Sequence, residues 1–147
     1  MSLENDVRNL ERTRPFDLLP RDALRLVAFS CSKTALRAGK TLFLEGQAAD
    51  AAYFVLSGAI ALSARGAERR VEAGALIGET ALLADVLRQA DARAVEDAVT
   101  LRIPGEVFRR VLSEFPQAAA KVRAATAARA RDFLDRLEEV RAREFES

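Results

Sequence analysis

The residues best suited to chemistry are the pair Gly78–Glu79 and the arginine Arg88, nine positions after the glutamate. Glycine adopts backbone angles closed to other residues and lets a ligand approach the main chain closely. The next residues suit a single helical turn, whose first N–H groups attract anions. A returning strand could bring Arg88 to the same place, where its parallel donors match a phosphate. Glu79 would repel a phosphate but accept from a sugar hydroxyl, so the pattern indicates a phosphate joined to a sugar.

The same residues also allow an interpretation without a ligand. Gly78–Glu79 would then be a simple turn with a solvated acid, and Arg88 one of many surface arginines in an arginine-rich chain. The local pattern is a weak signal by itself, so the surrounding elements must decide between the two interpretations.

The composition argues against most enzymatic chemistry. Histidine is absent, which removes Ser-His-Asp and Cys-His nucleophilic schemes, histidine-based zinc sites and histidine general bases. The single cysteine, Cys31, has no internal disulfide partner and no histidine to activate it, so we expect a packed small hydrophobe. We therefore predict no catalytic residue, no metal site and no resident cofactor, and a chain that binds rather than catalyses.

Length and charge favour a single globular domain over residues 1–147. Half of the residues are hydrophobic and 31% are charged, which is typical of a soluble protein. With 23 basic and 22 acidic residues, the net charge is only +1, and no basic excess favours binding to nucleic acid. The charged N-terminus lacks a signal-peptide pattern, and no apolar run approaches a membrane span. We expect a cytoplasmic protein.

Short apolar segments separated by glycines predict strands from about residue 33 to about residue 103. The stretch TALRAGKTLFLEG carries two short strands around a turn at Gly39, and AAYFVLSGAIALSA carries two more around Gly58. Arg65–Gly66 is typical of a hairpin tip, and ADARAVEDAVTLRI of two strands joined by an acidic turn. Frequent turns between short strands favour an antiparallel sandwich or barrel.

Helices are predicted on both sides of these strands. The stretch PRDALRLVAF, residues 20–29, has one apolar face, and Pro104 suits the first turn of a helix over GEVFRRVLSEF. A second, alanine-rich helix begins at Pro116, so C-terminal helices are expected over about residues 104–145. Along the last helix runs an apolar stripe made of Thr126, Ala130, Phe133, Leu137 and Val140. Packing of this stripe against the barrel is the simplest expectation.

Three segments together carry a family resemblance. They are LRAGKTLFLEGQAADAAYFVLSGAIAL, then VEAGALIGETALL with RQADARA, then IPGEVFRRVLSEFP. Together they resemble the cyclic nucleotide-binding domain family, which includes the catabolite activator protein, the regulatory subunits of cyclic AMP-dependent kinase and cyclic nucleotide-gated channels. The resemblance covers about residues 18–116. Its turn glycines stand in the expected order at Gly39, Gly46, Gly58, Gly74 and Gly78.

The resemblance implies a mainly β fold with flanking helices (α+β). The expected core is an eight-stranded antiparallel β-roll (double-stranded β-helix, or jelly roll) with an N-terminal helix and a long C-terminal helix. A phosphate-binding cassette would lie between two strands, with Glu79 accepting from the ribose 2′-hydroxyl and Arg88 binding the cyclic phosphate. Backbone N–H groups would complete the cradle. The implied ligand-binding residues are Gly78, Glu79, Thr80, Ala81, Arg88, Gln89 and Ala90.

Some residues depart from the usual family pattern: Thr80, Gln89 and Asp91. Gln89 replaces the small or hydroxyl residue common in the family, where threonine or serine often accompanies cyclic GMP binding. An inward-pointing Asp91 would oppose a phosphate. Alternation along a strand instead places Arg88 and Ala90 on one face, with Gln89 and Asp91 on the other. The phosphate contacts are therefore expected to be intact.

The resemblance makes a signalling sensor the expected function. The sensor would bind a cyclic mononucleotide, cyclic AMP rather than cyclic GMP, and act on an unidentified effector protein. We expect neither direct nucleic-acid binding nor membrane binding. In the family the C-terminal helix caps the base or forms a dimer seam, so the sequence allows a homodimer through this helix. The alternative function is a degenerate β-roll that binds no nucleotide and serves as a protein-interaction or dimerisation module.

Overall fold

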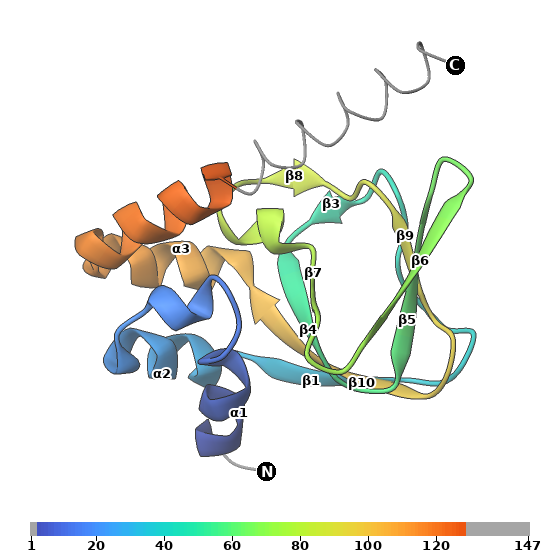
Figure 1. Ribbon diagram of the computed structural model, residues 1–147, viewed down its shortest axis with the longest axis horizontal. Coiled ribbons are helices and arrows are strands. Elements are labelled where there is room, and N and C mark those ends of the chain that lie inside the picture. The colour runs from blue at the N-terminus through green and yellow to red at the C-terminus, as the bar shows by residue number, and fades with distance from the viewer. Residues whose placement is uncertain (1–2, 129–147) are drawn as a thin grey trace, which may run out of the picture.

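A computed structural model describes residues 3–128, with helices on one side of a β-roll and the β5–β6 hairpin on the other (Figure 1). The flanking helices are α1 (Leu3–Leu10), the 3-10 turn η1 (Phe16–Leu18), α2 (Arg21–Phe29) and α3 (Gly105–Glu114), followed by helical residues 116–128. Helices after Pro104 and Pro116 are thus observed where the sequence predicts them. The predicted apolar stripe lies outside the described residues beyond Thr126.

The roll is built from short antiparallel strands. They are β1 (Ser32–Leu36), β2 (Thr41–Phe43), β3 (Ala48–Ala49), β4 (Ala51–Ser57), β5 (Ala59–Ala64), β6 (Ala67–Glu72), β7 (Leu76–Ile77), β8 (Val86–Leu87), β9 (Asp91–Ala94) and β10 (Ala98–Pro104). Two four-stranded sheets, in the orders β1-β10-β4-β7 and β2-β9-β5-β6, supply the eight strands of the predicted roll. Strands β3 and β8 add a two-residue ladder. The predicted fold class is confirmed.

Strand β4 separates two hydrophobic cores because both of its faces are buried. Ala52 and Phe54 face the helices, where the rings of Phe16 and Phe108 meet edge to face at 5.7 Å. Tyr53 alternates to the opposite face and packs inside the roll. This double burial explains why the strand reads as the nearly continuous apolar run AAYFVL instead of an alternating pattern. It also carries an aromatic ring into the interior of the roll.

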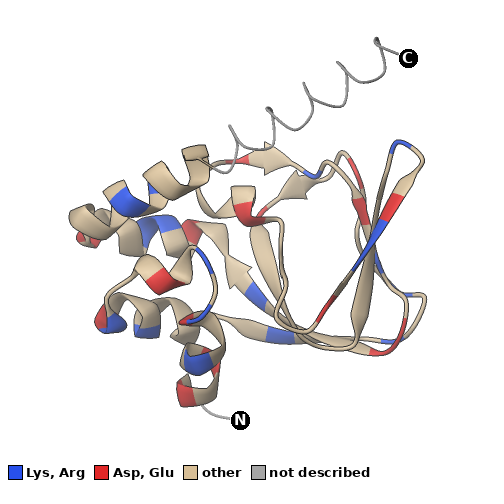
Figure 2. Ribbon diagram, in the orientation of Figure 1, with Lys and Arg blue, Asp and Glu red and all other residues tan. Residues whose placement is uncertain are grey.

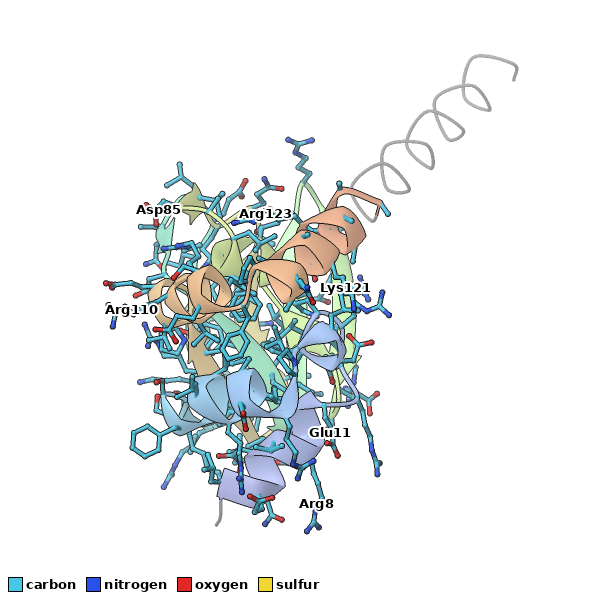
Figure 3. The ribbon with its side chains drawn as sticks, turned by 90° about the vertical axis from the view of Figure 1, so that its left-hand side faces the viewer. Arg8, Glu11, Asp85, Arg110, Lys121 and Arg123 are labelled. Atoms are coloured by element: carbon cyan, nitrogen blue, oxygen red, sulfur yellow. The ribbon has the colours of Figure 1, made fainter. Side chains whose placement is uncertain are left out.

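Charged residues of both signs are interspersed over the helices and the outer strands (Figure 2). The view onto the helical side places Arg8, Glu11, Arg110, Lys121 and Arg123 around the outside of the molecule (Figure 3). Such mixing agrees with the net charge of +1. Within the described part of the chain, no helix has the length and apolar character needed to cross a membrane.

Cys31 lies between α2 and β1 and packs against the helical core. Its Sγ–H donates to the carbonyl of Val27 at 3.3 Å. Burial raises the pKa of the thiol to about 12, and the negative charge of Asp6 adds to this effect. Because the thiolate is the reactive form, we expect Cys31 to react slowly in the folded chain.

We expect iodoacetamide to alkylate Cys31 at pH 8 about a thousandfold more slowly in the folded than in the unfolded chain, whose thiol pKa is about 8.5. The raised pKa favours the folded state fully below about pH 8.5, and this contribution is lost as the pH rises towards 12. Mass spectrometry of quenched samples, with and without denaturant, measures the two rates. Equal rates would contradict the inert thiol.

Candidate functional site

The turn that follows β7 has the geometry expected for Gly78. This glycine has φ of 72°, in the left-handed region that favours glycine, and precedes the 3-10 turn η2 (Glu79–Leu82). The predicted single helical turn is therefore present. After it, the chain returns through β8, and the next residue is Arg88. A Cβ built on Gly78 would lie 2.6 Å from Arg88 Nη1, so the glycine lets the guanidinium lie against the turn.

Arg88 is a buried cation whose hydrogen bonds are incomplete. Only 6% of the residue is exposed, and Nη2 donates to the carbonyl of Ala51 at 2.8 Å. Its Nε and Nη1 atoms are buried and have no hydrogen-bond partner among the described residues. Buried donors are nearly always paired in folded proteins, because an unpaired one costs about 1–3 kcal/mol. These two unpaired N–H groups, called the open donors below, are the feature of the structure that most directly indicates a missing acceptor.

The charge around Arg88 favours an anion. Asp50 Oδ1 lies 3.9 Å from Nη2, but Asp50 is largely exposed and its other oxygen accepts from Arg102 Nη2 at 3.0 Å. Burial lowers the pKa of the Arg88 guanidinium, an effect that Tyr53 and Asp50 oppose. The group stays charged at neutral pH all the same, since the ordinary pKa of a guanidinium lies far above neutrality. Because its ion pair with Asp50 is long, this buried positive charge attracts an anionic ligand.

A cavity of about 180 Å³ lies beside Arg88. Its walls are Phe43, Ala49, Leu62, Ile77, Gly78, Thr80, Leu87, Arg88, Gln89 and Ala90. Five of the seven predicted site residues line it: Gly78, Thr80, Arg88, Gln89 and Ala90. Glu79, half-buried at the start of η2, and Ala81, fully buried beneath it, do not. A larger cavity of about 560 Å³ lies between η1 and the 116–128 helix, but its lining has no buried unpartnered donor among the described residues.

The residues after Arg88 alternate largely as the sequence predicts. Arg88 is buried and Ala90 half-buried, whereas Gln89 and Asp91 are exposed. Asp91 Oδ1 accepts from the backbone N–H of Glu45 at 2.7 Å, so this carboxylate is held by the loop after β2. Gln89, although exposed, also contributes to the wall of the cavity.

Helix α3 supports the η2 turn through contacts that sequence reasoning missed. Arg109 Nη1 donates to the carbonyl of Ala81 at 3.1 Å, and its Nη2 donates to Asp85 Oδ1 at 3.2 Å. Gly105 allows the close packing, since a Cβ there would lie 2.1 Å from the Ala81 carbonyl oxygen. A glycine directly after Pro104 was the available signal, but nothing in the sequence identifies what it packs against.

The fold and the site together define a class of protein: a β-roll with a small cavity beside a buried arginine. A sequence model of the Cyclic nucleotide-binding domain family matches residues 33–115. The chain therefore belongs to the cyclic nucleotide-binding domain family, which confirms the resemblance seen in the sequence.

Solved structures of related proteins agree with this assignment. A cyclic nucleotide-binding-like protein from Brucella abortus is 38% identical, with a TM-score of 0.67 over 74% of this chain and 98% of the other. The regulatory domain of Toxoplasma gondii PKA, crystallised with cAMP, is 26% identical, with a TM-score of 0.68 over 74% of this chain and 44% of the other. Both structures share the β-roll described above.

A curated relative comes from a different kind of protein. The lysophospholipase nte1 of Neurospora crassa is 30% identical over 125 residues, which make up 81% of this chain. The chain spans about 8% of the length of the curated relatives it matches. The similarity therefore concerns a small part of that protein.

Proposed function

We propose that the chain is a regulatory sensor that binds a cyclic mononucleotide, cyclic AMP in preference to cyclic GMP. The observation that carries this proposal is the pair of open donors on Arg88, Nε and Nη1, buried beside the Gly78 turn. A cyclic phosphodiester has one negative charge and two free oxygens, each of which can accept from a guanidinium N–H. The positive charge and the open donors thus both match the phosphate.

The remaining site residues are assigned from the family. Glu79, at the start of η2, would accept from the ribose 2′-hydroxyl, and backbone N–H groups of Gly78 and Ala90 would surround the phosphate. The N–H of Ala81, which the resemblance also implied, instead donates to the carbonyl of Gly78 at 3.1 Å. Thr80 and Gln89, which also line the cavity, would lie near the sugar and the base. The Toxoplasma gondii domain crystallised with cAMP supports the choice of cyclic AMP, as does Gln89 in place of a hydroxyl residue.

We infer a protein effector as the partner that reads the signal. Arg109 and Gly105 of α3 contact η2, so a ligand that moves this turn would also move α3. A binding role in the cytoplasm, without catalysis, membrane binding or direct nucleic-acid binding, agrees with the absence of histidine and the net charge of +1. A homodimer through the C-terminal helix would involve residues outside the described range. We also propose that residues 1–147 act as one domain.

One observation favours the degenerate roll as a second candidate. The cavity of about 180 Å³ is smaller than the roughly 300–1,000 Å³ of pockets that bury a drug-sized ligand. In the proposed function this volume takes the phosphate and the ribose, while the base lies outside it. In the second candidate it takes no nucleotide, and the roll serves as a protein-interaction module.

Titration calorimetry distinguishes the two functions. We expect saturable binding of cyclic AMP, binding of cyclic GMP about tenfold weaker or more, and little binding of 5′-AMP, whose dianionic phosphate needs more countercharge. Bound ligand should also raise the melting temperature, because it stabilises only the folded state. If millimolar cyclic AMP and cyclic GMP produce neither heat nor a thermal shift, the sensor is excluded and the degenerate roll is favoured.

A further inference from the structure

Arg88 must be stabilised as a buried cation while its donors stay open for a ligand. A carboxylate bound to the guanidinium would neutralise its charge and occupy donors that a ligand needs. In the structure Asp50 approaches Nη2 instead, at 3.9 Å, and is engaged by Arg102 at 3.0 Å. The carbonyl of Ala51 accepts one hydrogen bond from the guanidinium, donated by Nη2. Some other interaction must offset part of the cost of burying this charge.

Two aromatic rings lie close to the guanidinium of Arg88. Its Cζ atom lies 4.2 Å from the ring centroid of Phe43 and 5.6 Å from that of Tyr53. Both distances are within the roughly 6 Å over which a cation is attracted to a ring face. Phe43 comes from β2 and Tyr53 from β4, and their centroids are 6.1 Å apart at an interplanar angle of 35°. Both residues are buried, so water competes little with this attraction.

We propose that Phe43 and Tyr53 are positioning residues for ligand binding, which stabilise and orient the Arg88 guanidinium without occupying its Nε and Nη1 donors. Arginine donates hydrogen bonds in the plane of its guanidinium, whereas an aromatic ring attracts it through its face. The two kinds of contact therefore do not compete. This inference rests on the proposed function, because it assumes that an anion takes the open donors.

The contacts hold the guanidinium from several directions. Ala51 fixes Nη2, the Phe43 ring covers a face, and the Gly78 turn lies beside Nη1. An arginine held in this way loses little conformational entropy when a phosphate arrives, which improves affinity. Phe43 also forms part of the cavity wall, so the same ring shapes the space and positions the donor group.

Ring removal at each position tests the proposal by calorimetry with cyclic AMP. We expect Phe43→Leu to weaken binding about tenfold, since a desolvated cation–π contact contributes a factor of about ten to affinity. Tyr53→Leu, at the longer distance, should weaken it about threefold, whereas Tyr53→Phe keeps the ring and should bind within about twofold of the wild type. Phe16→Leu, which removes a buried ring in the other core, should lower the melting temperature and leave the affinity unchanged.

A second measurement needs no ligand. The ¹⁵N NMR signal of the Arg88 Nε–H, assigned by its loss in Arg88→Met, should shift in Phe43→Leu because the ring that shields it is gone. This readout keeps the inference testable if the wild type binds no cyclic nucleotide, a result that would remove the proposed function alone. A folded Phe43→Leu with wild-type affinity or an unshifted Arg88 signal would overturn the inference. If Phe43→Leu does not fold, equal binding by Tyr53→Leu and Tyr53→Phe overturns it.

Discussion

Replacing Arg88 by methionine is expected to weaken cyclic nucleotide binding at least about a hundredfold, because two charge-assisted hydrogen bonds of about 1.5–3 kcal/mol each are lost. The ligand-free protein should melt at the wild-type temperature or above it. Methionine removes a buried cation with two open donors. It also keeps an unbranched side chain against the ring of Phe43. The substitution should therefore lower the affinity for the ligand without lowering the melting temperature.

Titration calorimetry measures the affinity of Arg88→Met and differential scanning calorimetry its melting temperature. Arg93→Met is the matched control, since Arg93 is exposed on the neighbouring strand β9 and should tolerate the same change in both measurements. A variant of Arg88 that still binds cyclic AMP like the wild type would refute the site. A loss of more than about 3 kcal/mol of stability would show instead that Arg88 is a structural residue.

Gly78→Ala should also abolish most binding, because it displaces the side chain of Arg88. Alanine at φ of 72° costs about 1–2 kcal/mol of stability. Its Cβ would lie 2.6 Å from Arg88 Nη1, so the end of the arginine side chain must move. That movement should cost little folding energy, because it displaces a buried cation whose hydrogen bonds are incomplete, but it also displaces the donors from the phosphate. We expect affinity to fall about thirtyfold or more, the equivalent of about 2 kcal/mol.

Gly74→Ala separates the two effects of this substitution. Gly74 has φ of 95° and open space where a Cβ would be, so alanine there meets the backbone cost without touching Arg88. Both variants should unfold at similarly reduced denaturant concentrations, and only Gly78→Ala should lose affinity for cyclic AMP. Equal affinities in the two variants would show that the close approach of Gly78 to Arg88 has no role in binding.

Much of the fold follows from local signals in the sequence. Gly39 and Gly58 both adopt positive φ angles at turns between strands, as their positions between apolar segments predict. Pro104 and Pro116 mark the starts of helices for an equally local reason: Pro104 is the N-cap of α3, and Pro116 is the first residue of the next helix, where proline fits. Turn and helix-start preferences depend on a few adjacent residues, and for that reason they can be read without knowledge of the packing.

The site divides between what is local and what is not. The Gly78 turn and the approach of Arg88 to it come from one continuous segment, and the sequence predicts both. The partners of Arg88 come from elsewhere: Phe43 from β2, and Ala51 and Tyr53 from β4. No local pattern reveals them, because they meet Arg88 only when strands far apart in the chain pack around one interior.

The sequence by itself therefore determined the family, the roll and the segment that would hold a phosphate. Only the tertiary structure decided the state of the arginine in that segment: how deeply its charge is buried, and which donors remain open. It also brought Arg109 of α3 to the back of the η2 turn. The physical reason is that chain geometry and residue preference act over short separations, whereas burial and electrostatics depend on everything that packs nearby.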